Sequence, residues 1–188
     1  MGRPHGRDDV QSALIQAAIT LFAERGPAAV SVREIASAAG VNHGLVHRHF
    51  GSKTGLLRAV LNHLAGDLEA AVGPDRPDES LQELLTGVLG AASHQGAWLR
   101  ILAWSMLDGV ELGDLQDRFP LARRMMEVAR RESLGPLDPE ARVTLVMSVG
   151  LGLLLFGPFL MRATDQDDAR WARTRQQILG SILTSRES

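Results

Sequence analysis

The stretch from Ser31 to Lys53, SVREIASAAGVNHGLVHRHFGSK, limits the possible folds of this chain most strongly, because it predicts two short helices joined by a tight turn. Ser31 and Glu34 have the spacing of a capping box, in which the serine oxygen accepts from the backbone three residues on and the glutamate reaches back. Gly40 stands where such a turn needs positive φ, and Asn42 is a favourable cap for the second helix. The spacing therefore predicts a helix-turn-helix.

Apolar residues recur at helical spacing in both predicted helices and give each an inward face. They are Val32, Ile35, Ala36 and Ala39 in the first helix, and Leu45, Val46 and Phe50 in the second. The residues of the second helix left facing outward are His43, Gly44, His47 and Arg48. Such a helix enters the DNA major groove with its N-terminal half nearest the bases, so this outward row is a candidate DNA-reading surface. A small helical hairpin with no DNA role is the alternative.

Four segments near the N-terminus resemble the TetR, or tetracycline-repressor-like, family of transcriptional regulators. They are GRP at residues 2–4, LFAERG at 21–26, IA at 35–36 with AGV at 39–41, and HF at 49–50 with SK at 52–53. The resemblance implies an all-α fold in which an N-terminal three-helix helix-turn-helix domain, residues 1–52, binds DNA. It also implies that residues 53–188 form a helical domain that binds a small molecule and dimerises through its last two long helices.

Two positions depart from the pattern of that family. A tyrosine is usual where His47 stands. Both side chains can donate to a phosphate, but histidine also changes charge near neutral pH. An acidic residue is commoner where Gly55 stands, so the fourth helix is expected to lack the usual reciprocal cap.

The charge of the chain is divided unevenly along its length. Residues 1–63 carry seven Lys and Arg against four Asp and Glu, a net +3, together with five of the six histidines. The remaining 125 residues carry thirteen against eighteen, a net −5, which restores the total of −2. This asymmetry is typical of a DNA-binding head on an acidic body, although a solvated surface alone can also produce it.

Two more basic sites flank the predicted helix-turn-helix. Arg3 and Arg7 flank a proline in an N-terminal arm that could lie along the minor groove or the phosphates, and a frayed terminus is the alternative. Ser52 caps a fourth helix whose first turn holds Lys53, the one lysine in the sequence. A helix N-terminus favours an anion, so this pair is a candidate phosphate clamp. The full set of predicted DNA-binding residues is Arg3, Ser31, Asn42, His43, Gly44, His47, Arg48, His49 and Lys53.

The sequence GPDRPD, Gly73–Asp78, is the clearest predicted linker, because two prolines within it cannot continue a helix. Apolar stripes beyond it predict helices starting near residue 81, around residues 98–108, over 119–134 and over 167–184. In the third of these, the charged residues are expected to form a salt-linked, solvated face. They are Arg123, Glu127, Arg130 and Arg131.

Residues 143–161 form an apolar segment of nineteen residues without a charge. A helix of that length spans roughly 28 Å, close to the hydrocarbon thickness of a bilayer. Its three glycines and Pro158 argue against a membrane span, as does the absence of flanking aromatic or basic anchors. A helix that is apolar all round also suits burial between a domain core and a partner subunit, and we expect a homodimer helix and no membrane contact.

Large aromatic and adaptable side chains mark the expected ligand pocket in the C-terminal domain. The predicted ligand-binding residues are Trp98, Trp104, Met106, Met125, Phe156 and Phe159. Methionine repacks easily around a guest, and indole offers a donor beside an apolar wall. With no charge obvious among them, they favour a small apolar or amphipathic effector. Ordinary core filling is the alternative for each residue taken singly.

The inventory of reactive residues argues against an enzyme. The sequence has no cysteine and no tyrosine, and it shows no nucleophile elbow and no dinucleotide fingerprint. His43 and His47 have a spacing that can hold zinc, but no third ligand is apparent, so no metal or cofactor is expected. We expect a cytoplasmic, ligand-released repressor that binds a pseudo-palindromic operator in double-stranded DNA. The alternatives are a hydrolytic enzyme on a helical scaffold and a single-span membrane protein with a DNA-binding head.

Overall fold

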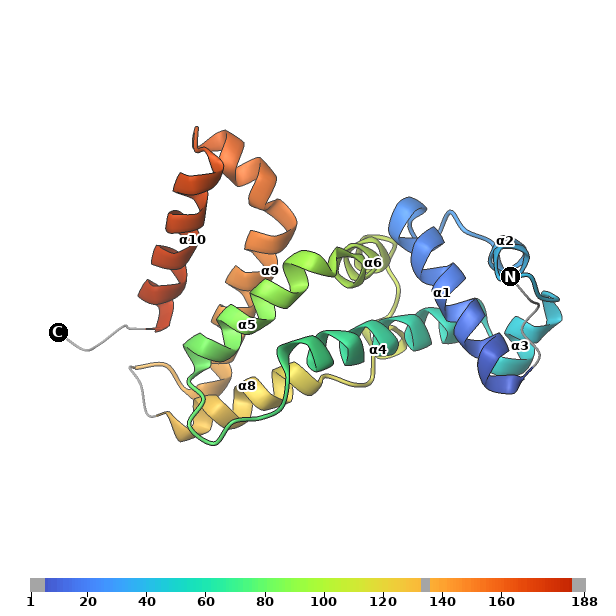
Figure 1. The fold of residues 1–188 in the computed structure, drawn as a ribbon, viewed down its shortest axis with the longest axis horizontal. Coiled ribbons are helices and arrows are strands. Elements are labelled where there is room, and N and C mark those ends of the chain that lie inside the picture. Colours follow the sequence, from blue (N-terminus) through green and yellow to red (C-terminus); the bar gives the residue numbers. More distant parts are fainter. Residues whose placement is uncertain (1–5, 133–135, 184–188) are drawn as a thin grey trace. The chain divides into compact units, whose positions relative to one another are not determined.

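The computed structural model describes residues 6–132 and 136–183, and Arg3 lies outside them. Within these ranges the chain forms ten helices and no strand, which confirms the predicted all-α fold (Figure 1). The helices group into two compact units, one of residues up to 67 with 96–119, the other of 68–95 with residues from 120 onward. The predicted functional boundary between residues 52 and 53 does not coincide with this division by packing, and it stays a prediction.

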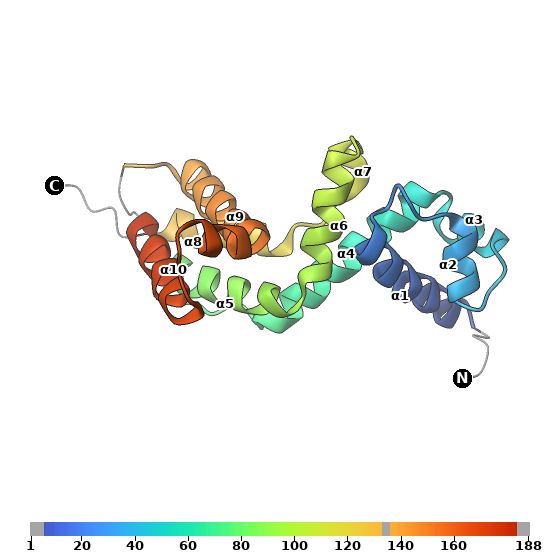
Figure 2. The ribbon, with the colours of Figure 1, turned by 90° about the horizontal axis from the view of Figure 1, so that it is seen from above.

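The first unit contains the helices that were predicted to bind DNA. It consists of α1 (Arg7–Arg25), α2 (Val32–Ala38), α3 (Gly44–Phe50), the first part of α4 (Lys53–Val72), α6 (Gly96–Leu107) and α7 (Leu112–Leu115). Residues of α1 at four-residue spacing form one buried stripe, and α1 packs on both α2 and α6 (Figure 2). The stripe joins the core whose fully buried members include Leu14, Phe22, Ile35, Val46 and Leu61.

The second unit has its own core. Its helices are α5 (Leu81–His94), α8 (Pro120–Arg131), α9 (Pro139–Ala163) and α10 (Asp168–Leu183), together with the end of α4. Two side-chain caps fix where helices begin: Ser80 and Glu83 form a capping box before α5, and Asp138 accepts from the Ala141 N–H at 2.7 Å before α9. The core that these helices bury includes Leu81, Leu84, Leu85, Val128 and Val146.

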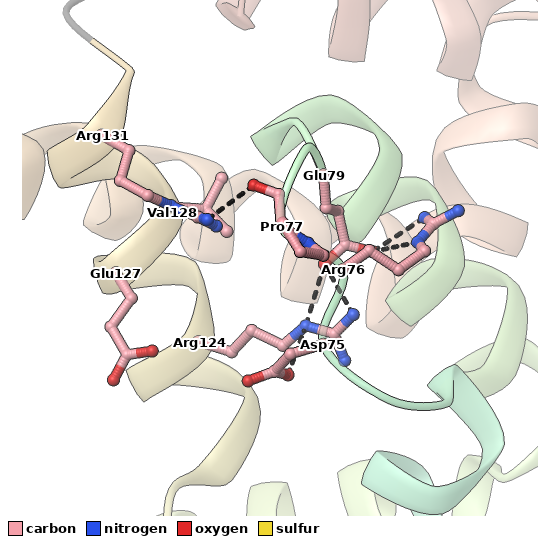
Figure 3. A pocket seen from close by; sticks show the side chains of 8 residues that line it. All are labelled: Asp75, Arg76, Pro77, Glu79, Arg124, Glu127, Val128 and Arg131. Atoms are coloured by element: carbon pink, nitrogen blue, oxygen red, sulfur yellow. Dashed lines mark hydrogen bonds and ion pairs between the residues drawn. The ribbon is translucent and has the colours of Figure 1, made fainter.

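The segment between α4 and α5 is non-helical, as predicted, but it is not a free linker. Arg124 of α8 reaches into it and donates to the carbonyl oxygens of Gly73 at 2.7 Å and Pro74 at 2.9 Å. The same guanidinium pairs with Asp75 at 2.9 Å and with Glu79 at 2.6 Å (Figure 3). The side chains of Arg124 and Glu79 are 7% and 3% exposed, so this is a buried ion pair. The sequence had indicated only a break in the helix at this place.

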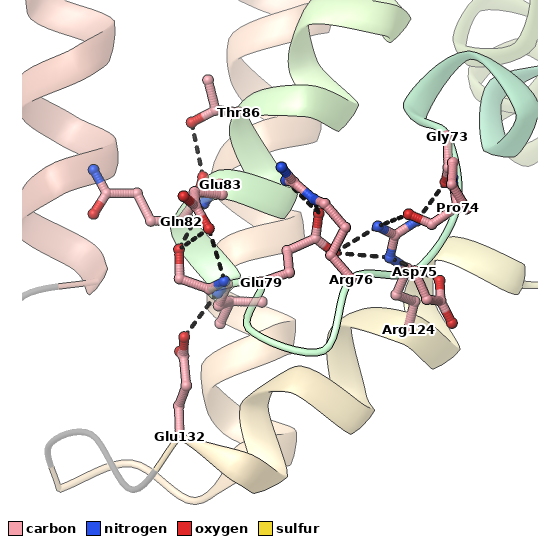
Figure 4. Close-up of polar contacts among 12 residues, drawn as sticks. Gly73, Pro74, Asp75, Arg76, Glu79, Gln82, Glu83, Thr86, Arg124 and Glu132 are labelled. Atoms are coloured by element: carbon pink, nitrogen blue, oxygen red, sulfur yellow. Dashed lines mark hydrogen bonds and ion pairs between the residues drawn. The ribbon is translucent and has the colours of Figure 1, made fainter.

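A second set of contacts holds the start of α5 (Figure 4). The Leu81 N–H donates to Glu132 Oε1 at 3.0 Å, so a carboxylate distant in sequence satisfies a donor in the first turn. The predicted solvated face of α8 is linked in part: Arg130 pairs with Glu140 at 3.1 Å, and Arg131 donates to the Pro77 carbonyl at 2.7 Å. The predicted end of this helix at residue 134 lies outside the described residues.

The helix α9 contains the apolar segment that raised the question of a membrane span. Among the described residues, it is the one helix whose length and composition would allow it to cross a bilayer. Its buried residues include Val143, Val146, Gly150, Leu153 and Gly157, which repeat at intervals of three or four along one face. That face packs in the core of the second unit, and the opposite face carries exposed apolar side chains.

Candidate nucleic-acid interface

The capping box at Ser31 has the predicted geometry and gains a third partner. Ser31 Oγ accepts from the Glu34 N–H at 3.2 Å, and Glu34 Oε2 accepts from the Ser31 N–H at 2.8 Å. Arg25, from the end of α1, donates to Glu34 Oε1 at 2.8 Å. The hydrogen bonds from the Ser31 backbone and hydroxyl, followed by that from Arg25, lower the pKa of Glu34 from 4.5 to about 2. The start of α2 is therefore fixed to the end of α1.

The turn between α2 and α3 depends on a glycine, as the sequence predicted. Gly40 has φ +68°, a conformation that side-chain-bearing residues rarely adopt. The Val41 N–H reaches back to the Ala36 carbonyl at 2.9 Å and closes the end of α2. Ala36 is buried at this crossing, where its small side chain lets the two helices approach.

The start of α3 differs slightly from the prediction. Asn42 was expected to be the N-cap, but the helix begins at Gly44 and the N-cap position belongs to His43. The Asn42 side chain still satisfies the helix end, because its Oδ1 accepts from the Gly44 N–H at 2.8 Å. On the inner face of α3, Val46 is fully buried, and Leu45 and Phe50 are partly buried against the same core.

The outward row His43, Gly44, His47 and Arg48 is exposed, as predicted. His47 Nδ1 lies 3.1 Å from the Gly51 carbonyl oxygen, which can only accept. That contact is a hydrogen bond when Nδ1 carries the proton, and neutral His47 then presents a bare Nε2 acceptor to solvent. While that hydrogen bond is kept, Nε2 can donate to a phosphate only when the ring is protonated on both nitrogens.

A basic hollow lies beside the row, between the start of α1 and the face of α3. Its volume is about 390 Å³, and it is lined by Gly6, Arg7, Val10, Leu45, Arg48 and His49. Three of these side chains can carry positive charge. Arg7 was expected in a flexible arm and was left out of the predicted DNA-binding set, but it forms the first residue of α1. Sequence spacing could not show that α1 begins beside α3.

The backbones of α3 and α4 approach each other closely at the corner where the two helices meet. Ser52 Oγ accepts from the Gly55 N–H at 2.9 Å, which confirms the predicted cap. A Cβ atom at Gly55 would overlap the carbonyl oxygen of Phe50, the last residue of α3. This overlap gives a physical reason why an acidic residue is absent here. Lys53 Nζ lies 3.4 Å from the Ala28 carbonyl, within the segment that joins α1 to α2.

The six predicted ligand-binding residues are divided between the two units. Trp98 packs on the core of the first unit and donates from Nε1 to Gln116 at 3.1 Å, and Trp104 and Met106 are exposed on the same helix. In the second unit Met125 is buried in the core, while Phe156 and Phe159 are exposed on α9. Their grouping in one cavity stays a prediction. No group of three or more potential metal ligands lies together in the described parts of the chain.

Two short helices crossing at a glycine turn, with an exposed row on the second helix and basic groups beside it, define a helix-turn-helix DNA-binding protein. Residues 14–60 match the family model described as bacterial regulatory proteins of the tetR family. The chain is 39% identical over 179 residues to the HTH-type transcriptional repressor Rv3405c of Mycobacterium tuberculosis, covering 95% of this chain and 90% of that protein. This chain belongs to the TetR family, and it is a DNA-binding transcriptional regulator, not an enzyme.

Solved structures share the fold over nearly the whole chain. A tetR-family regulatory protein from Rhodococcus RHA1 aligns with a TM-score of 0.66 at 19% identity, covering 95% of this chain and 98% of that one. The structure of BioQ with its double-stranded DNA operator aligns with a TM-score of 0.61 at 19% identity, covering 97% and 99%. At this identity the likeness supports the fold alone, and it extends through both compact units.

Proposed function

We propose that this protein is a repressor that binds a pseudo-palindromic operator as a homodimer and is released by a small apolar or amphipathic molecule. The observation that carries the proposal is the exposed row His43, Gly44, His47 and Arg48, held outward by the buried side chain of Val46. A two-fold dimer presents two such rows, which suits an operator with two half-sites. The cytoplasm is the compartment in which such a protein meets its DNA.

Within the proposed interface, the two ends of α3 have different tasks. His43 and Gly44 begin the helix, where side chains of a recognition helix reach base edges, so they bear on sequence preference. His47, Arg48 and the basic hollow with Arg7 and His49 suit phosphates, which fix the register of the protein on DNA without reading sequence. Arg3, Ser31, Asn42 and Lys53 complete the proposed set.

Lys53 must change partner to serve as a phosphate clamp. Its ammonium group lies 3.4 Å from the Ala28 carbonyl, a long contact in a partly exposed position. A phosphate would offer a negatively charged acceptor, so the ammonium group would gain a charge–charge attraction that the neutral Ala28 carbonyl does not give. The exchange therefore favours the phosphate.

The proposed dimer uses the exposed face of α9 together with α10. Leu145, Leu155, Phe156 and Phe159 of α9 are between 39% and 69% exposed. Large apolar side chains gathered on one helix face mark an interaction surface, and the family resemblance implies a second copy as its occupant. Phe159→Glu should convert the dimer to monomers in sedimentation experiments, whereas Arg123→Glu, an exposed change on α8, should not. An unchanged dimer in the Phe159 variant would rule out this face.

The proposed effector is apolar or weakly polar, because the candidate lining residues that are not assigned to the dimer face include aromatic and thioether groups. To release DNA a hundredfold, it must bind the released state about 2.7 kcal/mol better than the DNA-bound state. Burial of a few apolar groups in only one state supplies that difference. A panel of hydrophobic compounds, scored by tryptophan quenching and by loss of DNA binding, tests this part of the proposal.

The DNA interface is tested with a duplex that the wild-type protein selects from a random-sequence pool, which we call the selected duplex. Arg48→Ala and Lys53→Ala should each weaken binding to all sequences alike and make the salt slope shallower by roughly 0.9 per lost phosphate contact. Arg100→Ala, an equal loss of charge at an exposed site on α6, is the matched control. A wild-type salt slope in either interface variant would remove that residue from the phosphate contacts.

The His47 geometry gives an independent test. Donation from Nε2 with the Gly51 contact kept requires protons on both ring nitrogens, so affinity for the selected duplex should be higher at about pH 6 than at about pH 8. His47→Tyr should bind with a weaker dependence on pH, since a phenol donates throughout this range, while His43 and His49 stay unchanged. A pH profile that this substitution leaves unaltered would show that the charge of His47 has no part in binding.

A further inference from the structure

Trp104 lies against the end of α1, although it belongs to α6. A Cβ atom built on Gly26 would lie 3.2 Å from Trp104 Cδ2 and 3.3 Å from Cγ, so the centre of the indole covers the glycine. Both residues belong to the first compact unit. The tryptophan residue is nevertheless 45% exposed, which leaves a large part of an aromatic side chain in water. The ring therefore lies partly in solvent and partly on Gly26.

Gly26 is the point at which the chain leaves α1 for the helix-turn-helix. It has φ +77°, and its N–H closes α1 on the Phe22 carbonyl at 2.9 Å. Positive φ already favours glycine here, and the indole adds a second requirement, because a side chain at this position would press on the ring. The main chain then passes through the buried Pro27 and Val30 to Ser31, the cap of α2. The position of Gly26 thus sets where α2 begins.

Later residues of this turn have contacts of their own: Val30 is buried in the core, and its N–H donates to the Pro27 carbonyl at 3.3 Å. Arg25 donates to the Ala29 carbonyl at 2.9 Å, and Lys53 approaches the Ala28 carbonyl. The contacts of Arg25 and Lys53 are exposed and polar, so they add little to the rigidity of the turn in water. The indole supplies flat apolar contact at Gly26 itself, and α6 holds it through the fully buried residues Ile101 and Ser105 on either side of it in sequence.

We propose that Trp104 is a positioning residue for DNA binding: its ring on Gly26 fixes the turn from α1 into α2 and so holds α3 in the orientation that DNA requires. This role differs from that of a ligand-pocket residue. A pocket residue can be changed without weakening ligand-free DNA binding, whereas a positioning residue cannot. The inference rests on the established DNA binding of the family and does not depend on the proposed effector or dimer surface.

The test compares Trp104→Ala with Leu107→Ala, which removes a more exposed apolar side chain from the same helix. Binding to the selected duplex is measured without any effector, after circular dichroism and thermal unfolding have shown that each variant is folded. We expect Trp104→Ala to bind about tenfold more weakly, Leu107→Ala to bind like the wild type, and Trp104→Phe to recover most of the loss, because a phenyl ring keeps a flat face on Gly26. Wild-type affinity in a folded Trp104→Ala protein overturns the proposal.

A spectroscopic measurement keeps the proposal testable if Trp104→Ala does not fold. The sequence has three tryptophans, so the wild-type chain labelled with 5-fluorotryptophan gives three fluorine resonances, assigned by single Trp→Phe variants. Because the indole contacts the turn that DNA binding is expected to fix, adding the selected duplex should shift the Trp104 resonance. A Trp104 resonance that stays in place when the duplex is saturated would overturn the assignment.

Discussion

Two loops of this protein perform the same local task by different means. One joins α1 to α2 and the other joins α4 to α5, and each ends in a capping box, at Ser31–Glu34 and at Ser80–Glu83. Each is also held by an arginine. Arg25 is the last residue of α1, just before the first loop, and it donates to the Ala29 carbonyl and to Glu34. The side chains of Arg25 and Glu34 are 45% and 42% exposed.

The second loop is held from a distance and out of water. Arg124 lies 45 residues beyond its partner Glu79, and it binds two carbonyl groups and two carboxylates with 7% of its side chain exposed. An exposed ion pair contributes roughly 0–1 kcal/mol, whereas removing one member of a buried pair costs about 3–5 kcal/mol. The ion pair at the α1–α2 loop is therefore exposed and weak, whereas the ion pair at the α4–α5 loop is buried and costly to break.

The largest expected loss of stability follows from breaking the buried ion pair between Arg124 and Glu79. Arg124→Met should lower the free energy of unfolding by about 3 kcal/mol, because it leaves Glu79 buried with only the exposed Arg76 as a partner. Arg123→Met, at the adjacent exposed position on α8, should change it by less than about 0.5 kcal/mol. Urea unfolding at one fixed protein concentration measures both, because association would add to apparent stability. Equal effects of the two variants would contradict the burial argument.

The second prediction concerns the close approach of the backbone at the corner between α3 and α4, in the first unit. Gly55→Ala places a methyl group against the Phe50 carbonyl, so the α3–α4 corner must shift at a cost of about 1–3 kcal/mol. Binding to the selected duplex should weaken at least tenfold, since the end of the recognition helix moves. Gly66→Ala is the matched control in the same helix, where a methyl group meets nothing within 4 Å. That change should stabilise the helix by about 0.5–1 kcal/mol. If both variants behaved alike, the corner would have room that the structure does not show.

The parts of the fold that depend on neighbours in sequence could be predicted. The box at Ser31, the positive φ of Gly40 and the cap at Ser52 each join groups at most a few residues apart, and the structure confirms them. The start of α3 was misplaced because Asn42 and His43 can both serve as the last residue before a helix. The choice depends on which backbone group the Asn42 side chain meets.

The contacts that join distant segments could not be predicted. Arg124 has the same sequence signature as the solvated arginines around it, and only the packing of α8 beside the α4–α5 loop shows that it is buried. Gly55 is a local exception: Phe50 is only five positions away, but the sequence does not show how closely its carbonyl approaches, so Gly55 was interpreted as a missing cap. Trp104 was assigned by residue type to a ligand pocket, and its neighbour Gly26 is 78 positions away.

The third prediction concerns how much Glu34 and Glu79, the carboxylates that pair with arginine at the two loops, stabilise the fold at low pH. Hydrogen bonds from Ser31 and Arg25 lower the pKa of Glu34 to about 2, below the ordinary value of 4.5. Burial raises the pKa of Glu79, but Arg76 and Arg124 outweigh it and the pKa is lowered overall. A carboxylate whose pKa is lowered by folding stabilises the fold at pH values above its ordinary pKa. That contribution is lost as the pH falls through the pKa of the folded state.

We therefore expect the unfolding temperature of the wild type to fall between pH 4.5 and pH 2, and part of that fall to be absent in Glu34→Gln. The deficit of Glu34→Gln relative to wild type should be full at pH 6 and should shrink as the pH approaches 2, because Glu34 itself then becomes neutral. Thermal unfolding of both proteins across this range measures the difference. A constant deficit at every pH would show that the capping geometry, and not the charge of Glu34, carries the contribution.

The smallest effect is expected at Arg25, and salt distinguishes it from Arg124. Arg25→Met removes an exposed ion pair and one hydrogen bond to a carbonyl, so the free energy of unfolding should fall by no more than about 1 kcal/mol. Raising the salt concentration to about 1 M shortens the screening length to about 3 Å, and this should reduce the Arg25 effect while leaving the effect of Arg124→Met nearly unchanged. Urea unfolding of both variants at low and high salt provides the test. If the Arg25 effect persists in high salt, the hydrogen bond to Ala29 is its main source, and the two loops then differ in burial alone and not in their dependence on charge.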